Sequence, residues 1–141
     1  MLNVSAFAVI GAASVAVFAG TAGTVTLAAP ITANALTFNT AGYTLTGNTL
    51  TLAGTTPTIT TGTGAATIGS VIAGSAGLTK AGAGTLTLNG ANTFSGGVNI
   101  TGGVLSVATD AGLGDASNGI TMADTTGLTA TGALEIGRAH V

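Results

Sequence analysis

The stretch GLTKAGAGTLTLNGANTFSGGVNITGGVLSVA, which runs from Gly77 to Ala108, decides the fold. Glycine, threonine and small apolar residues dominate this stretch, and Lys80 is its one charged residue. In TLTL, residues 85–88, threonine and leucine alternate with the period of two that is typical of a half-buried β-strand. The links between such segments are rich in glycine and asparagine, which tolerate the positive φ angles of tight turns. The stretch therefore predicts short strands separated by turns.

The same alternation recurs along most of the chain. It predicts strands in TVTL (24–27), ALTFN (35–39), YTLTG (43–47), TLTLA (49–53), VNI (98–100), VLSV (104–107) and GITM (119–122), with the large apolar residues facing inward and threonine outward. Short strands and short turns suit a sandwich or a barrel, and they suit a solenoid equally well. The recurrence of LTLAG as LTLNG, and the doubled Gly-Gly step after it, favours the solenoid.

Composition excludes several classes of function. The chain has 141 residues, enough for one domain or part of one, and only 4% of them are charged, against about 25% in ordinary globular domains. The formal net charge is −2, so there is no basic surface for nucleic acid or anionic lipid. Because the chain has no cysteine, a disulfide scaffold and thiol chemistry are excluded as well.

The opening stretch resembles a known family, the autotransporter-associated β-strand repeat, also called the passenger-associated transport repeat. The resemblance extends over roughly residues 16–130 and implies a right-handed parallel β-helix. It further implies export by a Gram-negative bacterium to its surface, a role of the repeat in secretion, and a C-terminal translocator barrel, not contained in this chain, as partner. The residues that match the repeat are Gly77, Leu78, Thr79, Lys80, Gly82, Gly84, Thr85, Leu86, Leu88, Gly90, Asn92, Phe94, Gly96, Gly97, Gly103 and Leu105.

We expect residues 16–134 to form a truncated β-helix segment with the repeat motif at 77–108. Residues 1–15 are apolar and ill-defined, and the lack of a preceding Lys or Arg favours strand-forming sequence or a poorly defined start over a signal peptide or a spanning helix. The heptad EIGRAHV, residues 135–141, back-translates to the start of a common sequencing adapter. We interpret it as an artefact rather than a charged tail, so its histidine carries no function.

The sequence predicts no catalytic, cofactor or metal site. Asp110 and Asp115 could share a loop, but no His, Arg or second Lys lies near them to complete acid–base or nucleophilic chemistry. GLGDASNG, residues 112–119, faintly resembles a calcium-binding coil, yet its aspartate does not repeat from coil to coil, which favours ordinary turn residues. Lys80 is expected to be a solvated charge at a strand end or an edge guard. Asn89, Asn92 and Asn99 could stack as ladders in turns.

These observations favour a non-catalytic autotransporter passenger segment with a structural role in secretion and folding, and a role in adhesion or self-association. One alternative is the scaffold of an autotransporter enzyme whose active site lies outside this chain. Another is an ice- or surface-binding solenoid, for which the Thr-x-Thr pairs are too unevenly spaced. Expected partners are host or surface glycans and neighbouring passengers, and the unguarded strand edges predict that the isolated chain self-associates.

Overall fold

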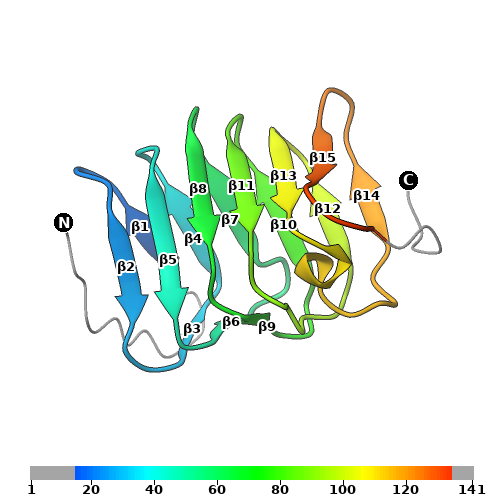
Figure 1. The fold of residues 1–141 in the computed structure, drawn as a ribbon, viewed down its shortest axis with the longest axis horizontal. Helices are drawn as coiled ribbons and strands as arrows, with labels where there is room; N and C mark the ends of the chain where they lie inside the picture. Colours follow the sequence, from blue (N-terminus) through cyan, green and yellow to red (C-terminus); the bar gives the residue numbers. More distant parts are fainter. Residues whose placement is uncertain (1–14, 135–141) are drawn as a thin grey trace.

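The chain winds into six coils of a right-handed parallel β-helix, as the computed structural model of residues 15–134 shows. In Figure 1 the strands of the near face run downward, those of the far face run back up, and each coil advances from the N-terminal to the C-terminal end, which makes the path right-handed. Each strand pairs in parallel with the equivalent strand of the neighbouring coils, on both sides for inner strands and on one side for the strands that end a sheet. The predicted parallel β-helix is therefore confirmed.

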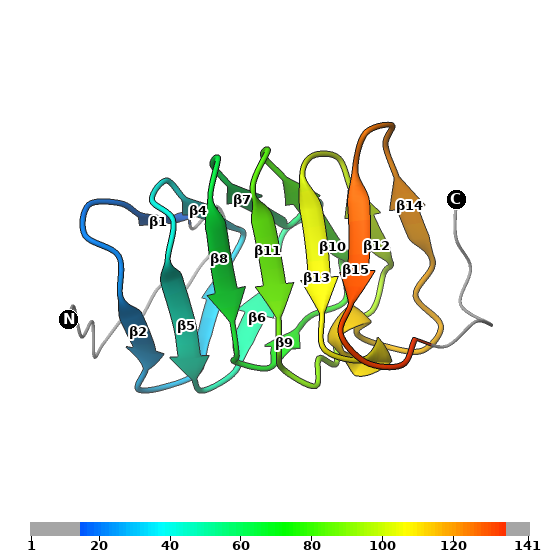
Figure 2. The same cartoon turned by 45° about the horizontal axis from the view of Figure 1, so that its top comes forward.

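Three parallel sheets form the sides of the solenoid. Sheet A contains β1 (Val15–Phe18), β4 (Ala35–Phe38), β7 (Thr58–Thr61), β10 (Leu78–Ala81), β12 (Val98–Ile100) and β14 (Ile120–Met122). Sheet B, whose strands lie side by side in Figure 2, contains β2 (Thr24–Leu27), β5 (Tyr43–Gly47), β8 (Ala65–Ile68), β11 (Thr85–Leu88), β13 (Val104–Val107) and β15 (Gly127–Ala130). Sheet C contains β3 (Ile31–Ala33), β6 (Leu50–Leu52) and β9 (Ile72–Ala73).

Coils of different length stay in register because the turns absorb the difference. Thr85 pairs with Val104, 19 residues later, whereas Ala35 pairs with Thr58, 23 residues later. Within the strands the side chains alternate strictly between the two faces. Uneven spacing in the sequence is therefore compatible with straight columns of equivalent side chains along the solenoid.

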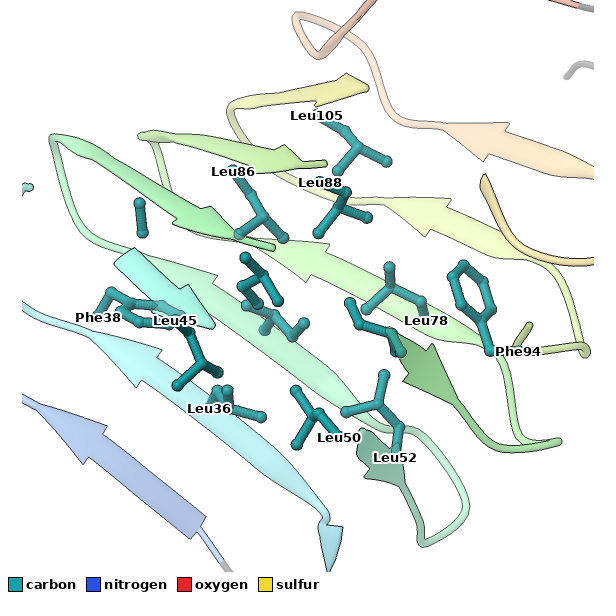
Figure 3. Packing of buried hydrophobic residues seen from close by; sticks show 14 of the residues in the cluster. Leu36, Phe38, Leu45, Leu50, Leu52, Leu78, Leu86, Leu88, Phe94 and Leu105 are labelled. Carbon is teal, nitrogen blue, oxygen red and sulfur yellow. The ribbon is translucent and has the colours of Figure 1, made fainter. Parts of the chain in front are cut away.

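Leucine, isoleucine and valine side chains fill the interior between the three sheets. In β11 and β13, Leu86 lies in register with Leu105, and Leu88 with Val107, and all four side chains are fully buried. Figure 3 shows the labelled leucines and the two labelled phenylalanines pointing into the enclosed space. The predicted inward positions are thus confirmed, and the core is one continuous apolar cluster that runs through the described coils.

The first two coils are joined by aromatic side chains. Phe18 and Phe38 stack with their ring centroids 4.6 Å apart, and Tyr43 tilts against Phe18 at 5.5 Å. The Tyr43 hydroxyl donates a hydrogen bond to the Ala19 carbonyl oxygen at 2.6 Å. This tyrosine keeps its ring in the core and satisfies its hydroxyl on the backbone of the preceding coil.

The third side changes its structure where the repeat motif begins. Sheet C ends at β9, and in the fourth coil the segment around Phe94 takes its place, with the Phe94 backbone N–H donating to the Ile72 carbonyl at 3.2 Å. In the fifth coil this side is occupied by η1 (Asp110–Leu113), a single turn of 3-10 helix. None of the described residues lies in a helix long and apolar enough to span a membrane.

The two terminal segments that the sequence singled out, residues 1–15 and 135–141, lie almost entirely outside the residues that the structure describes. Val15 already belongs to β1, and Leu134 is the last residue described at the other end. The interpretations of residues 1–14 and of the heptad 135–141 therefore remain predictions from the sequence.

We expect Leu86→Ala to lower the free energy of unfolding by about 2–5 kcal/mol, because it leaves a cavity in a fully buried column. The measurement is chemical denaturation followed by far-ultraviolet circular dichroism. The neighbouring Thr87→Ala, on the outward face of the same strand, is the control and should stay within about 0.5 kcal/mol of the parent chain. Equal losses for the two variants would contradict the assigned inward and outward faces.

Candidate functional site

The repeat motif places its residues in three kinds of position. Its large apolar residues Leu78, Leu86, Leu88, Phe94 and Leu105 are buried in the core. Its glycines lie mostly at corners between strands, and Thr79 and Thr85 face outward. Two polar residues, Lys80 and Asn92, are buried instead of exposed. The motif is thus spread over coils four and five, and its unusual feature is polar side chains inside an apolar solenoid.

Lys80 points into the solenoid. It lies in β10, in register with Ile59 of β7 and Ile100 of β12, and its exposed fraction is 0%. The prediction of a solvated charge at a strand end or an edge guard is therefore wrong, since Lys80 is buried and β10 lies inside sheet A. The physical reason is that the strand ends at a corner where backbone carbonyl groups converge, so the ammonium finds acceptors without reaching solvent.

The Lys80 ammonium bridges two coils. It donates hydrogen bonds to the carbonyl oxygens of Ala81 at 2.7 Å, Gly82 at 2.9 Å and Gly102 at 3.1 Å. Among the described residues, no backbone N–H donates to the Gly82 or Gly102 carbonyl, so the ammonium supplies the donor that these corner groups need. Gly82 has a φ of +82°, and a Cβ there would overlap the carbonyl oxygen of Thr61 in the previous coil. The corner is thus closely packed around the charge.

Burial makes the charged form of Lys80 unfavourable. The loss of hydration lowers the pKa of Lys80 from 10.5 to about 8. Its three acceptors are uncharged carbonyls, which compensate a buried cation only in part. The ammonium is therefore still protonated at neutral pH, but its charge opposes folding rather than favouring it.

Asn92 joins three successive coils on the third side. Its Oδ1 accepts a hydrogen bond from the Ile72 backbone N–H at 2.8 Å, and its Nδ2 donates to the Gly112 carbonyl at 2.8 Å. Asn89 and Asn99 are exposed, and Asn99 lies in β12 rather than in a turn. The three asparagines occupy different sides of the solenoid, so they form no common ladder, and Asn92 bonds to the backbone instead.

Asn118 is a second buried amide, which the sequence did not single out. Its Oδ1 accepts from the Gly97 backbone N–H at 3.1 Å, and its Nδ2 donates to the carbonyl oxygens of Phe94 at 3.0 Å and Leu113 at 2.9 Å. Asn118 lies two residues before Ile120, and Ile120 pairs with Val98. Asn118 therefore takes the position that Gly96 has in the preceding coil, and this correspondence was the signal available in the sequence. Where the motif has glycine, the next coil has an amide that bonds to the corner.

An open groove of about 610 Å³ crosses the last three coils at the corner that leads into sheet A. It is hollow because glycines occupy the corner, among them Gly77 and Gly97 on successive coils. Thr79, Asn99 and Thr121, which are in register with one another, line one side of it, and their side chains make no hydrogen bond within the described residues. No charged residue lines the groove. It is a neutral surface with free hydrogen-bonding groups.

The aspartates belong to turns. Asp115 follows η1, and its Oδ1 accepts hydrogen bonds from the Ser117 backbone N–H at 2.9 Å and hydroxyl at 2.6 Å. Asp110 is the first residue of η1, so the two aspartates lie in one loop region, in agreement with the expectation from the sequence. Within residues 15–134 there is no group of three or more His, Cys, Asp or Glu side chains that could hold a metal ion.

One file of hydroxyl groups runs along the outside of sheet B through all six coils. It consists of Thr24, Thr44, Thr67, Thr87, Ser106 and Thr129. The neighbouring file begins with Thr26 and Thr46 but meets Gly69 on the next coil. The Thr-x-Thr pairs therefore align better than their sequence spacing indicated, yet on sheet B they provide one continuous file rather than the two-dimensional array that an ice-binding surface needs.

The chain is similar to autotransporter sequences. Residues 78–107 match a family model described as the passenger-associated-transport-repeat. Over 119 residues, which are 84% of the chain, it is 59% identical to the protein named Adhesin BmaC autotransporter from Brucella suis biovar 1 (strain 1330). That stretch covers 4% of this relative, so the chain spans only a small part of its length. No solved structure matches the chain.

We expect Asn92→Ala to destabilise the fold by about 1–3 kcal/mol for each of the two backbone groups that it leaves buried without a partner. Asn89→Ala, an exposed asparagine of the same motif, is the matched control and should change the free energy of unfolding by less than about 0.5 kcal/mol. Denaturant titration of both variants measures the difference. A small effect for Asn92→Ala would show that the amide does not hold the coils together.

We expect the stability of the chain to rise with pH between about 8 and 10.5. In this window the unfolded chain still binds the Lys80 proton while the folded chain has released it, so the cost of burying the charge, about 3 kcal/mol, is relieved. The measurement compares denaturant titrations at pH 7.5 and 10.5 for the parent chain and Lys80→Met. The variant lacks this contribution to the slope, and identical pH dependence of the two proteins would refute the assignment.

Proposed function

We propose that the chain is a non-catalytic scaffold segment of an autotransporter passenger that takes part in adhesion, because residues 78–107 match the passenger-associated-transport-repeat and lie within a parallel β-helix. The passenger is displayed at the cell surface or secreted, and a translocator barrel of the same protein is its export partner. The name of the 59% identical relative, an adhesin, supports the adhesive role.

The scaffold role rests on one observation, which is that the buried polar side chains of the motif bond to the backbone of the coils. Lys80 and Asn92 direct their polar atoms to backbone groups of their own and adjacent coils, and Asn118 of the next coil does the same. Groups committed to buried backbone partners are not available to bind or transform a substrate. The motif therefore serves to join coils, and chemistry or ligand contact is left to outward-facing residues.

The outward surface that suits adhesion best is the groove beside sheet A. Thr79, Asn99 and Thr121 present hydroxyl and amide groups in register on three successive coils, about 4.8 Å apart. Because the groove has no charged lining, its natural partners are neutral, hydroxyl-rich glycans rather than acidic polymers. Contacts of this kind are individually weak, and repetition over many passengers on one cell supplies the avidity.

We expect particles coated with the chain to bind immobilised neutral oligosaccharides, derived from mannan, galactan and cellulose, more strongly than polygalacturonate. Asn99→Ala combined with Thr121→Ala should reduce that binding several-fold, because it removes groove groups without touching the core. Asn89→Ala combined with Thr87→Ala removes the same two residue types outside the groove and is the control. Equal binding by the two double variants would exclude the groove, and no binding by the parent would exclude neutral glycans.

A further inference from the structure

The side chains that stack in inward columns along the solenoid are nearly all apolar, so they do little to fix the register between neighbouring strands. The sheet A column that contains Lys80 otherwise consists of Ala16, Leu36, Ile59, Ile100 and Met122. A slip of one strand by two residues keeps every inward side chain inward, since the faces alternate with a period of two. The hydrophobic pattern alone therefore does not distinguish the native pairing of β10 and β12 from a pairing displaced by two residues.

Lys80 distinguishes the two pairings. In the native register its ammonium reaches the Gly102 carbonyl of the next coil at 3.1 Å, in addition to Ala81 and Gly82 of its own coil. A slip of two residues moves Gly102 by about 6–7 Å along the strand, which is beyond hydrogen-bond distance. The ammonium would then lose its contact with Gly102, and the Gly102 carbonyl would lose its donor.

The buried charge of Lys80 lowers the stability of the fold, but it favours one register of the coils. Buried ionic groups often stabilise less than apolar residues of similar size, and their best-attested use is to specify register. We propose that Lys80 is a register lock, meaning a buried charge that admits one alignment of coil five on coil four. It is thus a more specific form of the scaffold role proposed above, and it does not depend on any ligand.

Other polar contacts between these coils do not make Lys80 redundant. Asn92 and Asn118 act on the third side and at the corner before sheet A. At the corner after sheet A, the Thr101 hydroxyl donates to the Lys80 carbonyl at 3.1 Å, but Thr101 is exposed, so water can replace this bond after a slip. The ammonium has no such alternative.

Disulfide trapping tests the register lock, because the chain has no cysteine of its own. Thr79 and Asn99 are native partners on the outward face, about 4.8 Å apart, and cysteines at both positions should close a disulfide. The diagonal pairs Thr79 with Thr101, and Ala81 with Asn99, are in register only after a slip of two residues in one direction or the other. Each double-cysteine variant is unfolded, reduced and refolded under oxidising conditions, and mass spectrometry measures the disulfide.

In the parent background we expect the native pair to close and both diagonal pairs to stay reduced. With Lys80→Met, we expect at least one diagonal pair to close in a fraction at least ten times higher than in the parent background. Ile100→Met, which changes the shape of the same column without changing charge, is the matched control and should leave the diagonal pairs reduced. Lys80→Gln, whose shorter side chain falls short of Gly102, should behave like Lys80→Met and provides a second test.

The proposal is overturned if the Lys80 variants refold with the disulfide pattern of the parent. It is equally overturned if both variants fail to regain β-structure by circular dichroism, because the ammonium would then be required for folding itself rather than for alignment. Refolding in solution involves no glycan, so a negative result here leaves the adhesive role standing. Loss of glycan binding in the groove variants leaves the register lock standing in turn.

Discussion

No coil of this solenoid has a core of its own, and every other property of the structure depends on that constraint. A strand such as β11 contributes two inward leucines, which are buried only when β8 and β13 lie against it in register. Stability is therefore a sum of contacts between neighbours, as in other repeat proteins. Because alignment decides whether these contacts form, the features that fix register matter as much as the apolar residues that gain from it.

The sequence predicted the fold wherever strands carry large apolar residues with a period of two, as in TVTL and TLTL. It did not identify TITT in β7 or AATI in β8, because alanine and threonine at inward positions give little contrast between the faces. Register with neighbouring coils makes these segments strands. Such tertiary pairing is invisible in the local pattern, which also explains why unevenly spaced threonines align in a single file.

The site was less predictable than the fold, because its contacts form where backbone groups from different coils meet at the corners between sheets. The position of Lys80 at a strand end predicted a solvated side chain, because lysine is almost never fully buried. Counting from Leu78, however, the period of two already places Lys80 inward, and that position was the available signal. What the sequence could not show is that carbonyl groups of Gly82 and Gly102, from two different coils, meet at the point where the ammonium arrives.

Because its coils are alike, a solenoid is easily lengthened by further coils, but the same likeness allows neighbouring strands to pair in more than one register. The buried polar residues of the repeat favour one register, at a cost in stability. A chain built only of leucine columns would bury as much apolar surface in several alignments. A buried lysine or asparagine favours the native alignment, because its hydrogen bonds to corner groups of the adjacent coils form in that alignment and are broken by a slip. Because the polar groups that join the coils are buried, the neutral threonine and asparagine side chains of the groove remain available for contact with other molecules.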